Sequence, residues 1–123
     1  MKYVEKKGLK LSLFSLGTVQ LGMDYGLGDN TSKPQMADSF EILNCAVKNG
    51  VNSLDTANNY GDSERVIGKW LKTVDESKRP LIITKIGPFD HSSAQNLKDD
   101  IKRQTEKSLE TLGVSFIDVL MVH

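Results

Sequence analysis

The sequence predicts an α/β protein in which a short hairpin precedes four parallel strands that alternate with three helices. Three stretches carry apolar residues at helical spacing, and short, nearly continuous apolar stretches lie between them. The predicted sheet strands end near Leu16, Leu54, Thr84 and Val122, about 30 to 40 residues apart. This alternation is typical of right-handed βαβ units, which build a single parallel sheet.

Residues 1–12 are expected to form the hairpin. Segments 2–5 and 9–11 flank a short turn that contains Gly8, and glycine readily adopts a positive φ. Residues 13–16 are expected to form the first strand of the parallel sheet.

A long loop is expected from Gly17 to about Lys33. A loop of this length at the end of a sheet strand is more often functional than a plain connection. We therefore expect it to act as a lid over a substrate. Its glycines after position 17 are Gly22, Gly26 and Gly28.

The three helices are expected to end at residues that stop helices. The first runs from Ser39 to Asn49-Gly50, and the second covers residues 63–71, before Pro80. The third runs over residues 93–112 and closes at Gly113. The strands that follow the helices are expected over residues 51–54, 81–84 and 116–122.

The composition is that of one globular domain, residues 1–123. Of its residues 38% are hydrophobic and 26% charged, and 16 basic side chains balance 16 acidic ones. A chain without net charge lacks the basic surface of nucleic-acid binders, and no segment has the pattern of a membrane span or a signal peptide. The single Cys45 allows no intrachain disulfide, which favours a cytoplasmic location. The helical pattern places Cys45 and Trp70 on buried faces.

Two architectures fit this element order: an open doubly wound sheet and part of a barrel. The first requires the turn G-x-G-x-x-G after its first strand, but residues 17–22 read Gly-Thr-Val-Gln-Leu-Gly, and the sequence contains no phosphate-binding P-loop. We therefore expect the N-terminal half of a (β/α)8 TIM barrel, with its first four strands within residues 13–123.

Ionisable side chains lie at the ends of three successive predicted strands. These residues are Asp55, Lys85 and His123, and Tyr60 lies in the loop after the first of them. The carboxyl ends of parallel strands meet at one edge of the barrel, where barrel enzymes hold their active sites. Three such residues together predict a catalytic site rather than isolated caps or ion-pair partners.

The four side chains suit proton transfer to a carbonyl oxygen. A free phenol titrates near pH 10, so at about neutral pH it is a poor acid or base. A neighbouring ammonium group makes the phenol a better acid, because it stabilises the phenolate. The Lys85 ammonium would do this for Tyr60, and the Asp55 carboxylate would hold the ammonium in place. A neutral His123 would orient the substrate oxygen. Such proton transfer is useful when hydride is delivered to the carbonyl carbon.

The segment from Gly50 to Gly68 resembles the signature of the aldo-keto reductase superfamily. The matching residues, in order, are Asp55-Thr56-Ala57, Tyr60-Gly61, Ser63-Glu64 and Gly68. Thr84-Lys85 and Val122-His123 are similar to the motifs at the third and fourth strands of that family. The resemblance covers essentially the whole chain, including the hairpin that closes the bottom of the barrel in the family.

The resemblance implies an NADP(H)-dependent oxidoreductase that reduces an aldehyde or ketone and, in reverse, oxidises an alcohol. It implies Tyr60 as the general acid–base, Asp55 and Lys85 as the residues that tune it, and His123 as the residue that orients the carbonyl. The implied cofactor is NADPH, with NADH as the alternative, and no metal is expected. The cofactor contacts that it implies are Gly17, Thr18, Val19 and Asp55.

The length departs from the family pattern, because a complete barrel needs about 200 residues or more. We expect a truncated reductase whose missing half holds most of the cofactor site, so that this chain alone has little activity. Two alternatives stay open. One is a non-catalytic half-barrel that self-associates through its exposed edges or binds a partner chain. The other is a lyase in which Lys85 forms a Schiff base with its substrate.

Overall fold

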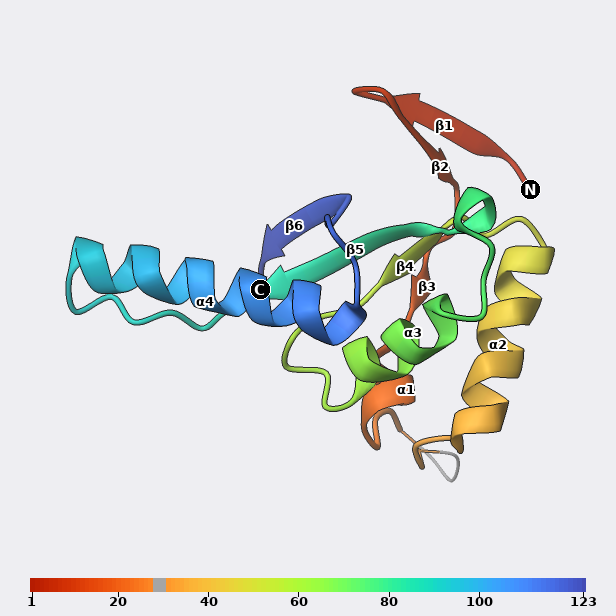
Figure 1. Ribbon diagram of the computed structural model, residues 1–123. Coiled ribbons are helices and arrows are strands. Elements are labelled where there is room, and N and C mark those ends of the chain that lie inside the picture. The colour runs from red at the N-terminus through yellow and green to blue at the C-terminus, as the bar shows by residue number, and fades with distance from the viewer. Residues whose placement is uncertain (28–30) are drawn as a thin grey trace.

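The residues that the structure describes form a two-stranded hairpin and a four-stranded parallel sheet with helices along one face (Figure 1). The computed structural model describes residues 1–27 and 31–123. The hairpin pairs β1 (Tyr3–Lys6) with β2 (Leu9–Ser12) in antiparallel register. In order across the parallel sheet, the strands are β3 (Leu16–Gly17), β4 (Ser53–Asp55), β5 (Leu81–Ile86) and β6 (Val119–Val122). The predicted partial barrel is thereby confirmed.

The predicted alternation of strands and helices is also confirmed. Helix α3 has the predicted ends, and α4 begins one residue later than predicted. Two short helices were not predicted, and one of them, α1, lies within the segment expected to be a loop. The helices are α1 (Val19–Gly22), α2 (Met36–Lys48), α3 (Ser63–Leu71), the 3-10 helix η1 (Glu76–Lys78) and α4 (Ala94–Leu112).

The first strand of the parallel sheet begins later than predicted, because the hairpin extends beyond β2. Residues 13–16 were expected to form this strand, but β3 begins only at Leu16. The backbone N–H of Leu13 donates to the Lys2 carbonyl oxygen at 3.0 Å, so residue 13 still belongs to the hairpin. Beyond it, Phe14 is 70% exposed, because its apolar side chain has no sheet to pack against.

Helix α4 begins and ends at residues whose local chemistry favours a helix terminus. The Ser93 hydroxyl accepts a hydrogen bond from the Asn96 backbone N–H at 3.0 Å, which satisfies one free donor of the first turn. At the other end Gly113 has φ +67°, and its N–H donates to the Glu110 carbonyl oxygen. A left-handed residue at this position favours glycine, so the predicted stop is confirmed.

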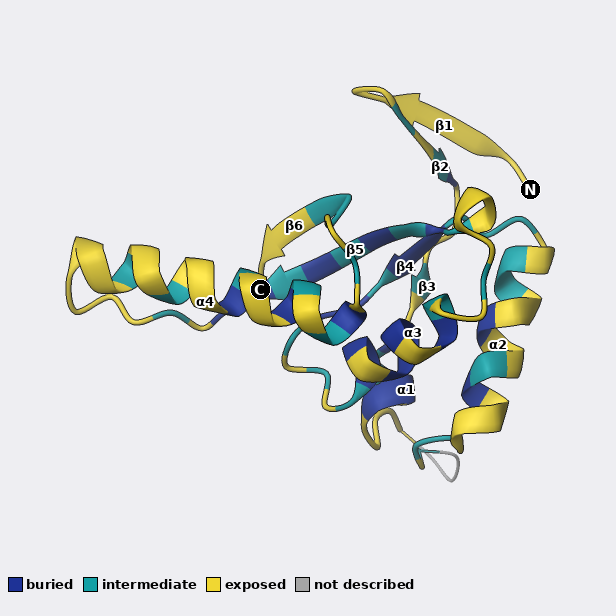
Figure 2. Cartoon of the chain, viewed as in Figure 1, coloured by how far each residue is buried: buried dark blue, intermediate teal, exposed yellow. Residues whose placement is uncertain are grey.

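The hydrophobic core lies between the sheet and the helices, as the buried segments in Figure 2 show. Trp70 is 1% exposed, and its indole N–H donates to the Asn44 side-chain oxygen at 2.8 Å. The predicted packing role of Trp70 is therefore confirmed. The buried hydrophobic residues of this cluster are Leu21, Leu43, Leu54, Val66, Ile67, Trp70, Ile82 and Leu112.

Cys45 is exposed, so the prediction that it packs in the core is wrong. Helix α2 turns its buried face inward at Ser39 and Leu43. Because successive helical residues are about 100° apart, Cys45 is rotated by about 200° from Leu43 and faces away from the sheet. The apolar residues around Cys45 are too many to be buried on one face of the helix.

The last strand is only partly covered. In β6, Leu120 is 42% exposed and Val122 is 75% exposed, whereas Ile82 in β5 is fully buried. Among the described residues, no strand pairs with the outer edges of β3 and β6. In the part of the chain that the structure describes, none of the helices has the length and hydropathy needed to cross a membrane.

Candidate active site

Four predicted residues meet at the carboxyl edge of the parallel sheet. Asp55 is the last residue of β4, Lys85 is the last residue but one of β5, and His123 directly follows β6. Tyr60 comes from the loop between β4 and α3. Because all these strands are parallel, their carboxyl ends place the side chains on one rim. We call Asp55, Tyr60, Lys85 and His123 the strand-end site.

Lys85 connects the members of the strand-end site. Its ammonium forms a close ion pair with Asp55 Oδ1 and donates to the Thr56 carbonyl oxygen at 3.1 Å. Lys85 Nζ also lies 5.1 Å from the centroid of the Tyr60 ring. The side chains of Lys85 and Asp55 are 15% and 36% exposed, so the ion pair is partly shielded from water. A positive charge is thus held beside a phenol.

The Tyr60 ring also lies beside the ring of His123. The two ring centroids are 5.4 Å apart, and the ring planes lie at 82° to each other, which is an edge-on arrangement. The backbone N–H of His123 donates to the Ile86 carbonyl oxygen at 3.0 Å, so the pairing of β5 and β6 extends to this residue. The structure therefore brings together all four residues predicted for catalysis.

Buried hydroxyl groups anchor the start of the loop that carries Tyr60. Thr18 Oγ1 donates to the Asp55 carbonyl oxygen at 2.9 Å, and Ser63 Oγ lies 2.8 Å from Thr18 Oγ1. Thr56 Oγ1 and Ser63 Oγ are 2.9 Å apart. All three side chains are at most 1% exposed. Since buried polar groups are costly when unpaired, this cluster holds β3, β4 and α3 in one arrangement.

Gly22 of α1 supports the same loop through direct backbone contact. The Asp62 N–H donates to the Gly22 carbonyl oxygen at 3.0 Å. A Cβ atom at Gly22 would overlap the carbonyl oxygen of Tyr60 and lie 2.9 Å from the Ser63 Cβ. Only glycine allows α1 to approach the Tyr60 loop this closely.

Glu64, which was not predicted to be catalytic, is buried behind the sheet. It is 6% exposed, and its Oε1 accepts a hydrogen bond from Thr84 Oγ1 at 2.7 Å. Thr84 precedes Lys85 in β5 and points to the opposite side of the strand. Glu64 therefore secures α3 against β5, and its carboxylate does not enter the strand-end site.

The residues predicted to contact a cofactor lie on the same rim but differ in accessibility. Gly17 is exposed, and a Cβ atom there would meet no atom within 4 Å. Val19 is partly exposed in the first turn of α1. Thr18 is 1% exposed, and its hydroxyl is engaged by Asp55 and Ser63. Of these three residues, Gly17 offers the most open surface.

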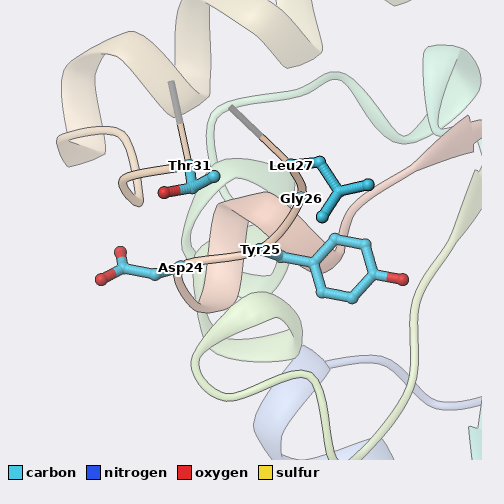
Figure 3. Close-up of a pocket in the computed structure, with 5 residues that line it drawn as sticks. All are labelled: Asp24, Tyr25, Gly26, Leu27 and Thr31. Atoms are coloured by element: carbon cyan, nitrogen blue, oxygen red, sulfur yellow. The ribbon is translucent and has the colours of Figure 1, made fainter. Parts of the chain in front are cut away.

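The segment predicted to be a lid borders an open hollow, which Figure 3 shows with Tyr25 and Leu27 projecting to the same side. The Lys33 ammonium donates to Asp62 Oδ2 at 2.5 Å and so ties the segment to the start of α3. This hydrogen bond, together with that from Arg65, lowers the pKa of the Asp62 carboxyl. Gly28, one of the predicted glycines, lies outside the described residues, and the lid role remains a prediction. The hollow is lined by Asp24, Tyr25, Gly26, Leu27 and Thr31.

Comparison with known proteins identifies the family. The model of the aldo/keto reductase family matches residues 14–123. The chain belongs to this family. Aldo-keto reductase str7 from Strobilurus tenacellus is 34% identical over 111 residues, and norsolorinic acid reductase from Aspergillus flavus is 31% identical over 127 residues. A crystal structure of an aldo-keto reductase from Pseudomonas aeruginosa has 31% sequence identity and superposes with a TM-score of 0.78.

The chain spans less than half the length of these relatives. The matches cover 89% of this chain and 31% of the Strobilurus protein, and 94% of this chain and 32% of the Aspergillus protein. The Pseudomonas structure covers 94% of this chain, which in turn covers 44% of that structure. This family of oxidoreductases has barrel folds, and the present chain corresponds to part of one barrel.

Proposed function

We propose that this chain carries the acid–base residues of an NADP(H)-dependent reductase of aldehydes or ketones. The observation that supports this most directly is the charged pair of Lys85 and Asp55 beside the Tyr60 ring, with the His123 ring edge-on to Tyr60. A cation held next to a phenol favours loss of the phenolic proton, which is what a tyrosine acid requires.

In the proposed reaction, Tyr60 and His123 hydrogen-bond the carbonyl oxygen of the substrate. A bound nicotinamide cofactor supplies hydride to the carbonyl carbon. The Tyr60 hydroxyl donates its proton to the oxygen as negative charge develops there, and the Lys85 ammonium stabilises the phenolate that remains. Asp55 holds the ammonium toward Tyr60. In the reverse direction, the phenolate takes the proton of an alcohol.

The rim of the sheet has room for the nicotinamide end of such a cofactor at Gly17. The exposed backbone there and the absence of any described atom within 4 Å of a would-be Cβ suit a flat ring that lies against the chain. We assign Gly17, Val19 and Asp55 to this contact. Thr18 supports it by donating a hydrogen bond to the Asp55 carbonyl oxygen. The Klebsiella pneumoniae aldo/keto reductase in complex with NADP and acetate has the same fold, with a TM-score of 0.71 and 22% identity.

The Schiff-base alternative receives less support from the geometry. A lysine nucleophile needs a free amine. The Lys85 nitrogen instead donates to Asp55 and to the Thr56 carbonyl oxygen, an arrangement that suits a cation.

We also propose a cytoplasmic location, which the single cysteine supports.

Where the complete reading frame that contains residues 1–123 continues into a second half-barrel, it encodes a longer polypeptide. We expect residues 1–123 alone to oxidise NADPH at least 100-fold more slowly than that longer polypeptide. In barrel enzymes the phosphate-binding loops commonly follow strands seven and eight. The measurement is the loss of NADPH absorbance with a panel of aldehydes and ketones. Equal rates for both polypeptides would contradict the expectation, and an inactive complete protein that binds NADPH would count against the reductase itself.

The isolated chain is expected to self-associate through its open sheet edges. Unpaired strand edges with exposed apolar side chains favour pairing with another copy. Analytical ultracentrifugation at micromolar concentration is expected to show dimers or larger species, and Leu120→Lys in β6 is expected to reduce them. Ile101→Lys, at an exposed apolar position of α4, is the matched control. A monomer at all concentrations would exclude this self-association.

A further inference from the structure

Gln104 is a buried polar residue in the seam between α4 and the sheet. It is 8% exposed, although its helix is otherwise rich in charged residues that face solvent. Its side-chain oxygen accepts hydrogen bonds from Asn58 Nδ2 at 2.7 Å and from the Gly87 backbone N–H at 2.8 Å. Its side-chain nitrogen donates to the Pro88 carbonyl oxygen at 2.9 Å and to Asp100 Oδ2 at 3.2 Å.

These bonds use the full capacity of a carboxamide, which offers two donors and two acceptor sites. A seam between a helix and a sheet can be filled by a leucine or methionine of similar size without any of these bonds. Gln104 also satisfies the buried Gly87 N–H, so an apolar residue here would cost stability by leaving that donor without a partner. Beyond this stability, the amide fixes the distance and direction between the groups that it joins.

The groups joined by Gln104 belong to the segments that carry the strand-end site. Asn58 lies two residues before Tyr60, and its backbone N–H donates to the Lys85 carbonyl oxygen at 3.0 Å. Gly87 lies two residues after Lys85. The carbonyl oxygen of Ile86, between Lys85 and Gly87, accepts the backbone N–H of His123. One amide oxygen therefore touches the loop of Tyr60 and the end of the strand that holds Lys85.

We propose that Gln104 is a positioning residue that sets the distance between Tyr60 and Lys85, through Asn58 on one side and Gly87 on the other. It contacts neither substrate nor cofactor and acts only by fixing two backbone segments. This inference rests on the proposed function, since it assigns a purpose to the spacing of the acid–base pair. A displacement of about 1 Å between reacting groups can reduce a rate by about 100-fold.

The first test measures the geometry itself in the 123-residue chain. Gln104→Met keeps the length and the apolar stem of the side chain and removes all four hydrogen bonds. We expect this variant to stay folded by circular dichroism and to lose the nuclear Overhauser contacts between the Lys85 side chain and the Tyr60 ring. Gln95→Met is the matched control, because Gln95 is exposed on the same helix and bonds only Asp99 among the described residues. It is expected to retain these contacts.

The second test separates positioning from a general structural role. Asn58→Ala removes the partner on the Tyr60 side and leaves the Gly87 bond to Gln104 intact, so it is expected to weaken the same contacts. The double variant is expected to be no worse than Gln104→Met alone, because both changes break one connection. In the polypeptide from the complete reading frame, Gln104→Met is expected to lower kcat, measured at saturating cofactor, by about 10-fold to 100-fold. The affinity for the cofactor is expected to change little.

Unchanged contacts between Lys85 and Tyr60 in folded Gln104→Met would overturn the inference, and so would additive losses in the double variant. If Gln104→Met does not fold, Asn58→Ala decides, since its side chain is only partly buried. These outcomes are independent of the reaction. If Tyr60 proves unnecessary for turnover, the proposed function fails, whereas the contacts measured by magnetic resonance still decide whether Gln104 positions the pair.

Discussion

Replacing Tyr60 by phenylalanine is expected to lower kcat for aldehyde reduction by about 10²- to 10⁴-fold, the usual contribution of a positioned acid–base group. The variant Tyr60→Phe removes only the phenolic oxygen and keeps the ring that meets His123 and Lys85. Packing and cofactor binding should therefore be preserved. The measurement is steady-state turnover in the polypeptide from the complete reading frame, with cofactor affinity determined by fluorescence titration.

Tyr3→Phe is the matched control for this prediction. It also removes one phenolic oxygen, which donates to the Gly50 carbonyl oxygen at 3.0 Å at the opposite end of the sheet. We expect its turnover to equal that of the unchanged protein. If Tyr60→Phe retained full turnover, a different proton donor would act in this site, and the assignment of Tyr60 would be wrong.

The alternation of elements could be predicted because local signals and tertiary structure agree. The spacing of apolar residues in α3 and α4, with Ser93 and Gly113 at the ends of the latter, predicts both helices almost to the residue. Helix α1 could not be predicted in this way. It has only four residues, and it is held by contact between Gly22 and the Tyr60 loop rather than by its own periodicity.

The strand-end site was predictable for a topological reason. Once the strands are taken as parallel, the positions of Asp55, Lys85 and His123 at strand ends predict their meeting. The residues that support the site carry no such signal. Gln104 follows no motif in the sequence, and a glutamine within a charged helix is ordinarily exposed. Its burial depends on where the loops after β4 and β5 lie, which only the folded structure reveals.

Replacing Gly22 by alanine is expected to destabilise the chain by about 3 kcal/mol, at the upper end of what overpacking usually costs. The added Cβ would overlap backbone atoms of Tyr60 and Ser63, and backbone cannot move aside as a flexible side chain can. Helix α1 would have to withdraw, and the hydrogen bond from Asp62 to the Gly22 carbonyl oxygen would be lost. Urea unfolding of the chain measures the change.

Gly17→Ala provides the stability control, because a Cβ there meets nothing within 4 Å. Its free energy of unfolding is expected to stay within about 0.5 kcal/mol of the unchanged chain, as for most exposed substitutions. Equal stability of the two variants would mean that α1 adapts without cost and that the tight contact at Gly22 does not hold the Tyr60 loop. We expect instead that only Gly22→Ala lowers the free energy of unfolding strongly and displaces the Tyr60 resonances, because α1 and the Tyr60 loop share one backbone contact.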